Sequence, residues 1–308
     1  MLKSKWDTFK FVDYLNVDTN EIRQLPEGIS VSTMCASCKL NTRLNIPNIE
    51  KYLQLNQDDI LTVKMNDNRL RSLLLSKKKS KRIREQEKKL DETKSHFYNQ
   101  ITVVVRITQG QVKDINDAPR INLKLFKNGS VQMSGCKSIK GINIALNKLI
   151  SKLKEIKGVM ENNMIIEKRF IEDIDKITVT DFKIDMINSN YQVSIQIDRD
   201  KLYNLLQKKK IKSSYEPCIR ACVIIKFIPD CDNEEQKEVS IFVFQKGNII
   251  ITGARSRSHI ISAYNYMNNI ILTYKDDIIK KDEKEEEDII FNIYNDILKD
   301  IKMGLIKI

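Results

Sequence analysis

The sequence predicts an α+β fold built from two similar repeats, which together form one curved antiparallel sheet with long helices on one face. Three observations support this prediction. A pattern of strand, tight turn, strand and helix start occurs twice, strand-like runs precede both copies, and an amphipathic helix follows each copy. Internal duplication of this size is the strongest architectural signal that a single sequence offers. The chain is therefore expected to be a tandem repeat with connecting and terminal segments.

The chain begins with an arm and ends with a helix, both outside the repeats. In order, the expected parts are an N-terminal arm (1–27), repeat 1 (28–157) with a basic insertion at about 64–96, a linker (158–176), repeat 2 (177–275), and a charged hinge with a C-terminal amphipathic helix (276–308). The arm carries Trp6 and Phe9 among charged residues and is expected to lie against the core. Isoleucines at helical spacing mark the C-terminal helix, which either covers the core or binds a partner.

The duplicated unit is a hairpin that ends in a helix start. In each copy an alternating strand reaches a phenylalanine, Phe126 or Phe244, and turns at a glycine three residues later, Gly129 or Gly247. Glycine takes the positive φ that a tight hairpin turn needs at little cost. Each second strand is followed by a cation and a serine, and serine is a favourable helix N-cap.

The segments around each hairpin also repeat. Strand-like runs occupy 100–107 and 220–227, with Arg106 and Lys226 at the seventh place of each run. The following helices have apolar residues at helical spacing. These are Ile142, Ala145, Leu149, Leu153 and Ile156 in the first helix, and Ile260, Tyr264, Met267, Ile271 and Tyr274 in the second.

Repeat 1 is longer than repeat 2. Pairing Ile29 with Met186 gives an offset of 157, and pairing Phe126 with Phe244 gives 118, so repeat 1 carries 39 extra residues. The excess includes the cationic run 76–84. Such a run is either a solvated loop or helix, or an arm that binds phosphates, because clustered cations release counterions from a duplex.

Composition favours an acidic partner and gives no sign of an enzyme. Lys and Arg number 53 against 41 Asp and Glu, a net charge of +12, which suits nucleic acid as well as simple solubility. The N-terminus has no apolar run typical of a signal peptide, and no stretch approaches a membrane span. The chain is therefore expected to be soluble and intracellular, in the nucleus or, for a viral protein, in a cytoplasmic factory or the virion.

Cysteines and histidines suggest neither a metal site nor a cofactor. Cys35 and Cys38 have C-x-x-C spacing, but a structural zinc needs four ligands and no second pair follows. The six cysteines are expected to be reduced inside a cell. The two histidines, His96 and His259, stand in no nucleophile or metal pattern. We therefore expect no catalytic residue, no metal and no cofactor.

Five short motifs, in order over residues 28–275, resemble the TATA-box-binding protein family, including divergent members of the kind that large DNA viruses encode. The motifs are Val31-Ser-Thr33 with Cys38-Lys-Leu40, the unit Phe126 to Lys137, Asp181-Phe-Lys-Ile184, Tyr215-Glu-Pro217, and the unit Phe244 to Arg255. The resemblance implies a saddle-shaped sheet whose concave face lies along the minor groove of AT-rich promoter DNA. It also implies bending, by phenylalanines wedged between base steps.

The resemblance assigns roles to particular residues. Phe126 and Phe244 fall on wedge positions. The remaining DNA-binding candidates are the sheet-face residues Phe242, Ile250, Thr252, Ser134 and Val31, and the phosphate-binding cations Arg106, Lys137, Lys226 and Arg255. At Tyr215 to Ile219 the family docks transcription factor IIB, so Glu216 and Ile219 are expected to bind a IIB-like factor. The alternative is that Ile219 is core and Pro217 merely shapes the turn.

Departures from the family pattern leave two functions open. Gln100 and Arg220 stand where the family has a second phenylalanine in each wedge, and Ile29 and Met186 stand where it has central asparagines. Repeat 1 presents Lys124, Gln132 and Ser134 where repeat 2 has Phe242, Ile250 and Thr252. The first function is a general transcription factor that bends promoter DNA and recruits a IIB-like factor and the RNA polymerase machinery. The second is a protein-interaction module of the same fold with weak or non-specific DNA binding.

Overall fold

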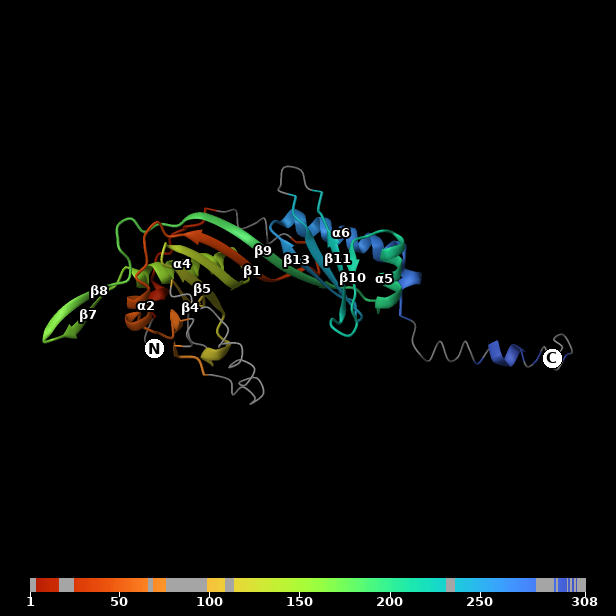
Figure 1. Cartoon of the computed structure of the whole chain (residues 1–308), viewed down its shortest axis with the longest axis horizontal. Coiled ribbons are helices and arrows are strands. Elements are labelled where there is room, and N and C mark those ends of the chain that lie inside the picture. Colours follow the sequence, from red (N-terminus) through yellow and green to blue (C-terminus); the bar gives the residue numbers. More distant parts are fainter. Residues whose placement is uncertain are drawn as a thin grey trace. The chain divides into compact units, whose positions relative to one another are not determined.

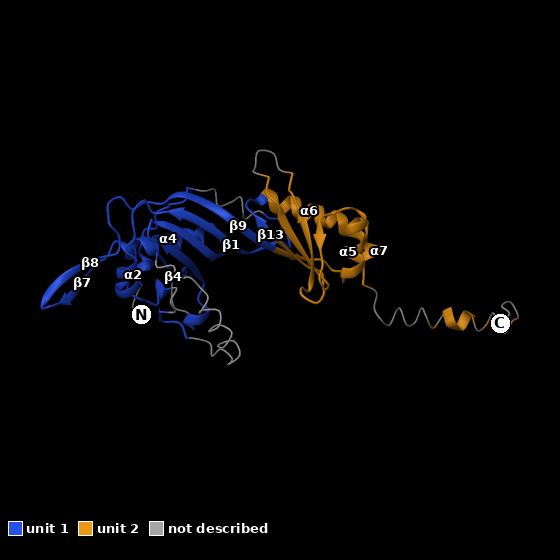
Figure 2. Ribbon diagram, viewed as in Figure 1, with its two compact units in different colours: residues 1–189, 253–257 blue, residues 190–252, 258–308 orange. Residues whose placement is uncertain are grey.

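The computed structural model describes residues 4–16, 25–65, 69–75, 99–108, 114–230 and 236–280, together with 291, 293–297, 299, 301 and 303 near the C-terminus. The chain forms two compact units, one of residues 1–189 and 253–257, the other of residues 190–252 and 258–308 (Figure 2). Unit 1 holds most of repeat 1, and unit 2 holds most of repeat 2.

Unit 1 contains a sheet with strand order β9-β1-β6-β5-β4-β2-β3 (Figure 1). The strands are β1 (Ser30–Lys39), β2 (Ile60–Lys64), β3 (Leu70–Ser72), β4 (Gln100–Arg106), β5 (Arg120–Phe126), β6 (Ser130–Cys136) and most of β9 (Thr180–Gln192). The helices are α2 (Ile46–Tyr52) and α4 (Ile139–Leu153), with short 3-10 turns at Lys5–Asp7 and Ile115–Asp117. The pairs β1–β6, β4–β5 and β5–β6 are antiparallel.

Helix α4 covers one face of this sheet. The Ser138 side chain caps its start by accepting from the Gly141 amide over 3.1 Å, as the sequence predicts. Along β5 every second side chain, including Leu123, is buried toward the helix. On α4 the apolar stripe that includes Ile142 and Leu149 is fully buried. Each buried aliphatic side chain contributes about 1.5–3 kcal/mol relative to exposure, so this layer holds unit 1 together.

The N-terminal residues lie against α4 and the loop before β2. Trp6 is 1% exposed, and its indole nitrogen donates to an Asp59 carboxylate oxygen over 3.3 Å. Farther along, the Val12 amide donates to the Asn147 side-chain oxygen over 2.9 Å, and the Asn147 amide group donates back to the Val12 carbonyl over 2.8 Å. Trp6 also lies 5.3 Å from the ammonium of buried Lys148.

A hairpin follows α4 that the sequence did not indicate. Strands β7 (Ile156–Glu161) and β8 (Met164–Arg169) form a separate two-stranded antiparallel sheet, which extends away from the rest of unit 1 in Figure 1. Ile156, expected on the helix, is instead the first residue of β7, and most of the expected linker is hairpin. The chain rejoins the unit at Phe170, which is fully buried.

Unit 2 repeats the plan of unit 1. Its sheet has the strand order β10-β11-β12-β13. The elements are β10 (Ser213–Ser214), β11 (Cys222–Phe227), β12 (Val239–Phe244), β13 (Asn248–Ala254), α5 (Arg199–Lys208), α6 (Arg257–Thr273) and α7 (Lys275–Ile278). The predicted strand, turn, strand and long helix are thus present twice, and the predicted α+β class is confirmed.

Backbone hydrogen bonds show which residues of the two repeats are equivalent. The Leu40 amide donates to the Gly129 carbonyl over 3.0 Å, and the Val193 amide donates to the Gly247 carbonyl over 2.9 Å. The two turns differ by 118 in number, as predicted, but the residues that bind them, Leu40 and Val193, differ by 153. The excess length of repeat 1 at this point is therefore 153 − 118 = 35 residues.

This register corrects the pairing of Ile29 with Met186, which required an offset of 157. With an offset of 153, Ile29 corresponds to Phe182, and Met186 corresponds to Thr33. Sequence pairing missed this because one β-strand gives no register of its own. The register appears only when each strand is anchored to its neighbouring turn.

The described residues near the C-terminus are helical at 291, 293–297, 299 and 301. Their apolar side chains are exposed, Phe291 by 64%, Ile293 by 54% and Ile297 by 44%, so in this structure they do not cover the core. Within the described ranges no helix combines the length and apolar character that crossing a membrane requires.

Candidate nucleic-acid interface

The sheet of unit 1 has a face that α4 does not cover. On β5 and β6 this face carries the cross-strand pairs Asn122 with Ser134 and Lys124 with Gln132. All four side chains are exposed or half-buried, whereas their chain neighbours point into the core. Ser134, one of the predicted binding residues, therefore lies on an accessible polar surface.

Unit 2 presents the equivalent face with a different chemistry. Here Ser240 pairs with Thr252, and Phe242 pairs with Ile250. These side chains are half-buried. Three predicted sheet-face residues, Phe242, Ile250 and Thr252, thus occur together on β12 and β13, and two large apolar side chains occupy the centre of the pair of strands.

Phe126 and Phe244 occupy the last positions of β5 and β12. Both are half-buried. In each turn the glycine amide donates back to the phenylalanine carbonyl, over 2.9 Å for Gly129 and 3.0 Å for Gly247. The two glycines have φ of +87° and +78°, in the left-handed region that glycine favours. The turns therefore hold both aromatic side chains at the end of an exposed sheet face.

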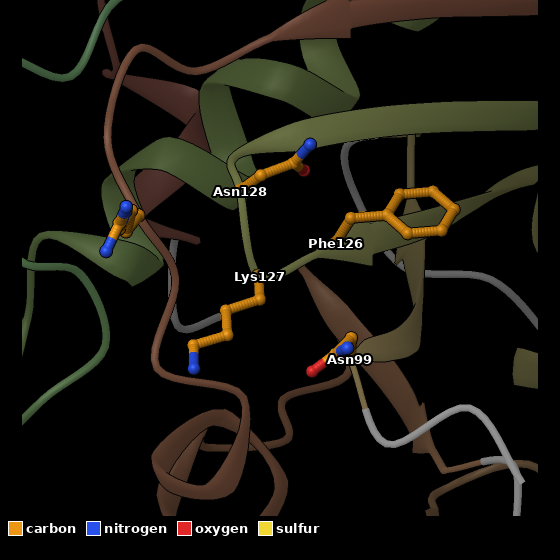
Figure 3. A pocket seen from close by; sticks show the side chains of 5 residues that line it. Asn99, Phe126, Lys127 and Asn128 are labelled. Atoms are coloured by element: carbon orange, nitrogen blue, oxygen red, sulfur yellow. The ribbon is translucent and has the colours of Figure 1, made fainter.

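A hollow of about 480 Å³ opens beside Phe126. It is lined by Arg43, Asn99, Phe126, Lys127 and Asn128. Figure 3 shows the Phe126 ring and the Lys127 side chain leaving the turn in different directions, with Asn99 nearby. The combination of an aromatic edge, amide groups and two cations suits an anionic ligand that also has a flat apolar part.

Unit 2 has an equivalent hollow of about 560 Å³ beside Phe244. Its lining residues are Gln196, Arg199, Ala221, Phe244, Gln245, Lys246 and Asn248. By the hairpin offset of 118, Lys127 corresponds to Gln245, and Asn128 corresponds to Lys246. The lysine of the second turn therefore lies one residue later than the lysine of the first. Each hollow nevertheless keeps one arginine and one turn lysine next to its phenylalanine.

These hollow-lining cations were not among the predicted site residues. A lysine near a turn glycine is a weak signal, because most exposed lysines are simply solvated. Arg43 and Arg199 could not be found from spacing, since they approach the turns only through the hydrogen bonds that tie the preceding loops to them. One such bond joins the Leu44 amide to the Lys127 carbonyl over 2.9 Å.

The strands that pair with β5 and β12 show that a second predicted equivalence, that of Gln100 with Arg220, is wrong. Gln100 pairs with Phe126, but the residue that pairs with Phe244 is Cys222. Arg220 lies two residues before Cys222, and its counterpart in repeat 1 is therefore residue 98, which lies outside the described residues. Gln100 and Arg220 are not equivalent, because β4 and β11 are related by an offset of 122 rather than 120.

The same offset separates Arg106 from Lys226, which were expected to be equivalent cations. Arg106 corresponds to Ile228, and Lys226 corresponds to Val104. Arg106 is 3% exposed. Its guanidinium donates to the Gln57 carbonyl and the Thr108 hydroxyl, each over 3.0 Å. It therefore fastens the end of β4 to the loop before β2 and does not present its charge at the surface.

The other predicted cations differ in accessibility. Lys226 is half-buried, donates to the Ser240 hydroxyl over 2.9 Å and lies 3.2 Å from a Glu238 carboxylate oxygen. Lys137 is exposed just before α4, and Arg255 is half-buried at the equivalent place before α6. Lys137 is thus the most accessible of the four predicted phosphate-binding residues.

Strand β1 carries Val31 and the C-x-x-C pair. Val31 is half-buried, like Cys35, whereas Cys38 is buried on the opposite side of the strand. An odd spacing in a strand places two side chains on opposite faces, so these cysteines do not converge on a metal. Burial also raises the pKa of the Cys38 thiol to about 12, which keeps it a neutral thiol. Within the described ranges no cluster of three His, Cys, Asp or Glu residues forms.

The predicted partner loop lies before β11. Ile219 is 73% exposed, so the alternative that it belongs to the core is wrong. The amides of Ile219 and Arg220 both donate to the Glu216 carbonyl, over 3.0 and 2.8 Å. The loop is therefore a hydrogen-bonded turn with an exposed apolar side chain beside the exposed carboxylate of Glu216.

Two comparisons of the sequence with known proteins indicate one family. Residues 181–274 match the family model described as "Transcription factor TFIID (or TATA-binding protein, TBP)". The chain is 35% identical over 265 residues to a protein of Acanthamoeba polyphaga mimivirus named "TATA-box-binding protein-like", an alignment that covers 80% of this chain. The chain spans 66% of the length of that relative. The solved structure of the Methanococcus jannaschii TBP matches with a TM-score of 0.44 and 18% identity, over 82% of this chain and 99% of that one.

Proposed function

Because the chain belongs to the TATA-box-binding protein family, we propose that it is a divergent transcription initiation factor that binds AT-rich promoter DNA through the minor groove and bends it. The observation that carries the proposal is the repeated site itself. In each unit a half-buried phenylalanine ends a strand at a glycine turn, next to a sheet face that the long helix leaves uncovered and a cationic hollow.

The wedge mechanism follows from these two positions. A flat apolar ring at the end of a sheet face can enter between base pairs that the bend has opened. Unstacking costs a few kcal/mol per step, and the bent duplex offsets this cost by covering more protein surface. Phe126 and Phe244 are assigned this role.

Phosphate binding is assigned to exposed cations around the same turns. Lys137 is retained from the predicted set, with Lys226 and Arg255 as weaker contributors because they are half-buried. The hollow residues Lys127 and Lys246 are added, since they flank the wedges. Arg106 is left out because its guanidinium is buried and satisfied within unit 1.

The bending test uses Phe244→Ala with a matched aromatic control. Losing one base-stacking contact weakens binding by about 1–3 kcal/mol, and the variant should bend the duplex less. Phe291→Ala is the control, because Phe291 is 64% exposed and lies outside the site. Fluorescence energy transfer between the duplex ends measures the angle. An unchanged angle for Phe244→Ala means that this residue is not a wedge.

The phosphate contacts are tested by salt dependence. Lys137→Ala should weaken binding to all sequences alike and lower the slope of log affinity against log salt by roughly one unit. Loss of affinity for one sequence only would show that Lys137 reads bases. Arg106→Met serves as a comparison and should leave the slope unchanged, because a buried guanidinium does not contact phosphate.

We also propose that a IIB-like factor docks on the Glu216–Ile219 turn, as part of recruiting the RNA polymerase machinery. An exposed apolar side chain beside a carboxylate suits a small contact, in which the buried group contributes most of the energy and the charge steers encounter. Cys218 stands between them where the family has a second glutamate, so a host IIB should bind more weakly than the cognate factor.

Recruitment of the cognate factor to preformed DNA complexes tests this surface. Glu216→Arg with Ile219→Ala should abolish capture in a pull-down. The matched control is Asp277→Arg with Leu272→Ala, since Leu272 is 78% exposed elsewhere on unit 2. Equal capture by the loop variant and the wild type would place the docking surface elsewhere.

The polar centre of the repeat 1 sheet favours a second candidate, a protein-interaction module with weak or non-specific DNA binding. Lys124 and Gln132 occupy places where repeat 2 has Phe242 and Ile250. Fluorescence anisotropy with a short AT-rich duplex at several salt concentrations separates the two candidates. Affinity that vanishes at physiological salt, with no sequence preference, supports the interaction module.

A further inference from the structure

The open sheet faces of the two repeats differ at three neighbouring places of one row of side chains. In unit 1, strand pairing places Thr102 beside Lys124, Lys124 beside Gln132, and Gln132 beside Ser37. Every member of this row is polar. Residues paired across antiparallel strands lie on the same face, so the row runs across four neighbouring strands, β4, β5, β6 and β1.

The equivalent row in unit 2 is apolar at its first three places, and the fourth, the counterpart of Ser37, is Asn190. Ile224 pairs with Phe242, and Phe242 pairs with Ile250. The offsets established above, 122 for the first strand and 118 for the hairpin, make Ile224 the counterpart of Thr102 and Phe242 that of Lys124. One duplicated surface thus carries two chemistries.

The polar row has unused hydrogen-bonding capacity. Within the described part of the chain, the side chains of Lys124 and Gln132 form no hydrogen bond or ion pair. The Ser37 hydroxyl oxygen is buried and likewise has no partner among the described residues. Lys124 and Gln132 are accessible, so they can bind a ligand without giving up a hydrogen bond within the protein.

The minor groove offers one feature that distinguishes these two surfaces. A·T and T·A pairs present only acceptors there, whereas a G·C pair adds the donor amino group of guanine. Against an apolar row this donor is desolvated without a partner, which is unfavourable. Against the polar row the exposed Gln132 side-chain oxygen accepts from it, while the Lys124 ammonium donates to neighbouring acceptors.

We propose that the two repeats read different halves of the DNA site. Repeat 2 requires A·T pairs, and repeat 1 accepts a G·C pair through Gln132 and Lys124. This inference rests on the proposed minor-groove binding and adds a composite target to it, one A·T half and one half that tolerates G·C. The specificity-determining residues are Lys124 and Gln132 in repeat 1, and Phe242 and Ile250 in repeat 2.

Three duplexes of equal length test the inference by anisotropy: one with A·T pairs only, one with a G·C pair in one half, and one with a G·C pair in each half. The protein can bind in either direction, so it places a single G·C pair under repeat 1. The first two duplexes should bind within about twofold of each other. The third should bind roughly tenfold more weakly, the scale of one mismatched pair.

Two exchange variants assign the effect to its residues. Lys124→Phe with Gln132→Ile gives repeat 1 the apolar pair, so this variant should bind the duplex with one G·C pair as weakly as the wild type binds the duplex with two. Phe242→Lys with Ile250→Gln should restore binding of the duplex with two G·C pairs. Circular dichroism checks that both variants fold, which is expected because these side chains are exposed or half-buried.

The outcomes separate this inference from the function on which it rests. No measurable binding of the A·T duplex by the wild type would overturn minor-groove binding itself. Binding of the A·T duplex together with a penalty for a single G·C pair, or with no penalty for two G·C pairs, would overturn only the division between repeats. Exchange variants with the wild-type pattern would do the same, because another part of the surface would then be reading the groove.

Discussion

Substituting Gly129 by alanine should destabilise unit 1 through a backbone contact that the sequence alone does not reveal. Gly129 has φ of +87°, and a Cβ atom built there runs into the carbonyl oxygen of Thr42. The residue also accepts a hydrogen bond from the Leu40 amide over 3.0 Å, so neither segment can withdraw without breaking the connection. The contact partner is backbone and cannot rotate away as a side chain would.

The loss of unfolding free energy in Gly129→Ala has two parts. Substitutions at other glycines of the same unit allow these parts to be measured separately. Positive φ in an alanine costs about 1–2 kcal/mol. Gly28 has nearly the same φ, +86°, with no atom within 4 Å of the built Cβ, so Gly28→Ala should show this cost alone. Gly135, at +79° with its nearest neighbours at 3.9 Å, is a second control. The collision at Gly129 should raise the total loss to about 3–4 kcal/mol, in the range of severe single substitutions.

The single tryptophan makes the measurement specific to unit 1. Trp6 is 1% exposed there, so urea unfolding followed by its fluorescence reports the free energy of unfolding of that unit. The expected order of loss is Gly129→Ala well above Gly28→Ala and Gly135→Ala. Equal losses in all three variants would refute the reasoning. The loss would then come from the positive φ alone, and the contact with the Thr42 carbonyl would not contribute to it.

Three further outcomes follow from buried groups. Burial lowers the pKa of Lys148 to about 8 from 10.5, so between these pH values the unfolded chain binds a proton that the folded chain lacks. The urea midpoint of the wild type should therefore rise with pH over this range relative to that of Lys148→Met. If the two midpoints change with pH in parallel, this reasoning is wrong. Trp6→Ala should lose about 3–5 kcal/mol of unfolding free energy, and Trp6→Phe less, because it loses the bond to Asp59 and one ring of the indole but keeps a buried aromatic ring; equal losses would show that a phenyl ring at this place contributes nothing. Mass spectrometry after brief alkylation should find exposed Cys218 modified and buried Cys38 unmodified, since burial also raises the pKa of Cys38 to about 12. Modification of both cysteines at similar rates would mean that β1 readily separates from the sheet.

Elements with local signals were predictable from the sequence. The turn glycines and the Ser138 cap depend on backbone conformation at single residues, which restricts the residue types that fit. The repeated hairpin followed directly, because two copies with the same spacing confirm each other. The β7–β8 hairpin was missed because its apolar residues, including Ile156, continue the helical spacing of α4.

Features that depend on register or on distant loops were not predictable. Cations at the seventh place of two strand-like runs suggested that Arg106 and Lys226 are equivalent, yet the pairing of these strands with β5 and β12 shifts them by two residues. The burial of Arg106 depends on the Gln57 loop, 49 positions away in sequence. Likewise Lys148 reads as an exposed helix lysine, but its ammonium donates to the Asp58 carbonyl over 2.6 Å. Chain segments brought together only by folding leave no local pattern.

The difference between the repeats implies that they bind DNA by different forces. Under the proposed function, the apolar row around Phe242 gains free energy by leaving water, which produces a negative heat-capacity change and little salt dependence. The polar row around Lys124 gains mainly through hydrogen bonds and through counterions released from phosphates, which weakens steeply with salt. Raising the salt concentration should therefore weaken the contacts of repeat 1 with DNA before those of repeat 2. Phe244 should remain inserted between base pairs at salt concentrations that displace Phe126. A duplicated fold with one apolar and one polar copy can in this way hold a duplex by one half while the other half engages or releases.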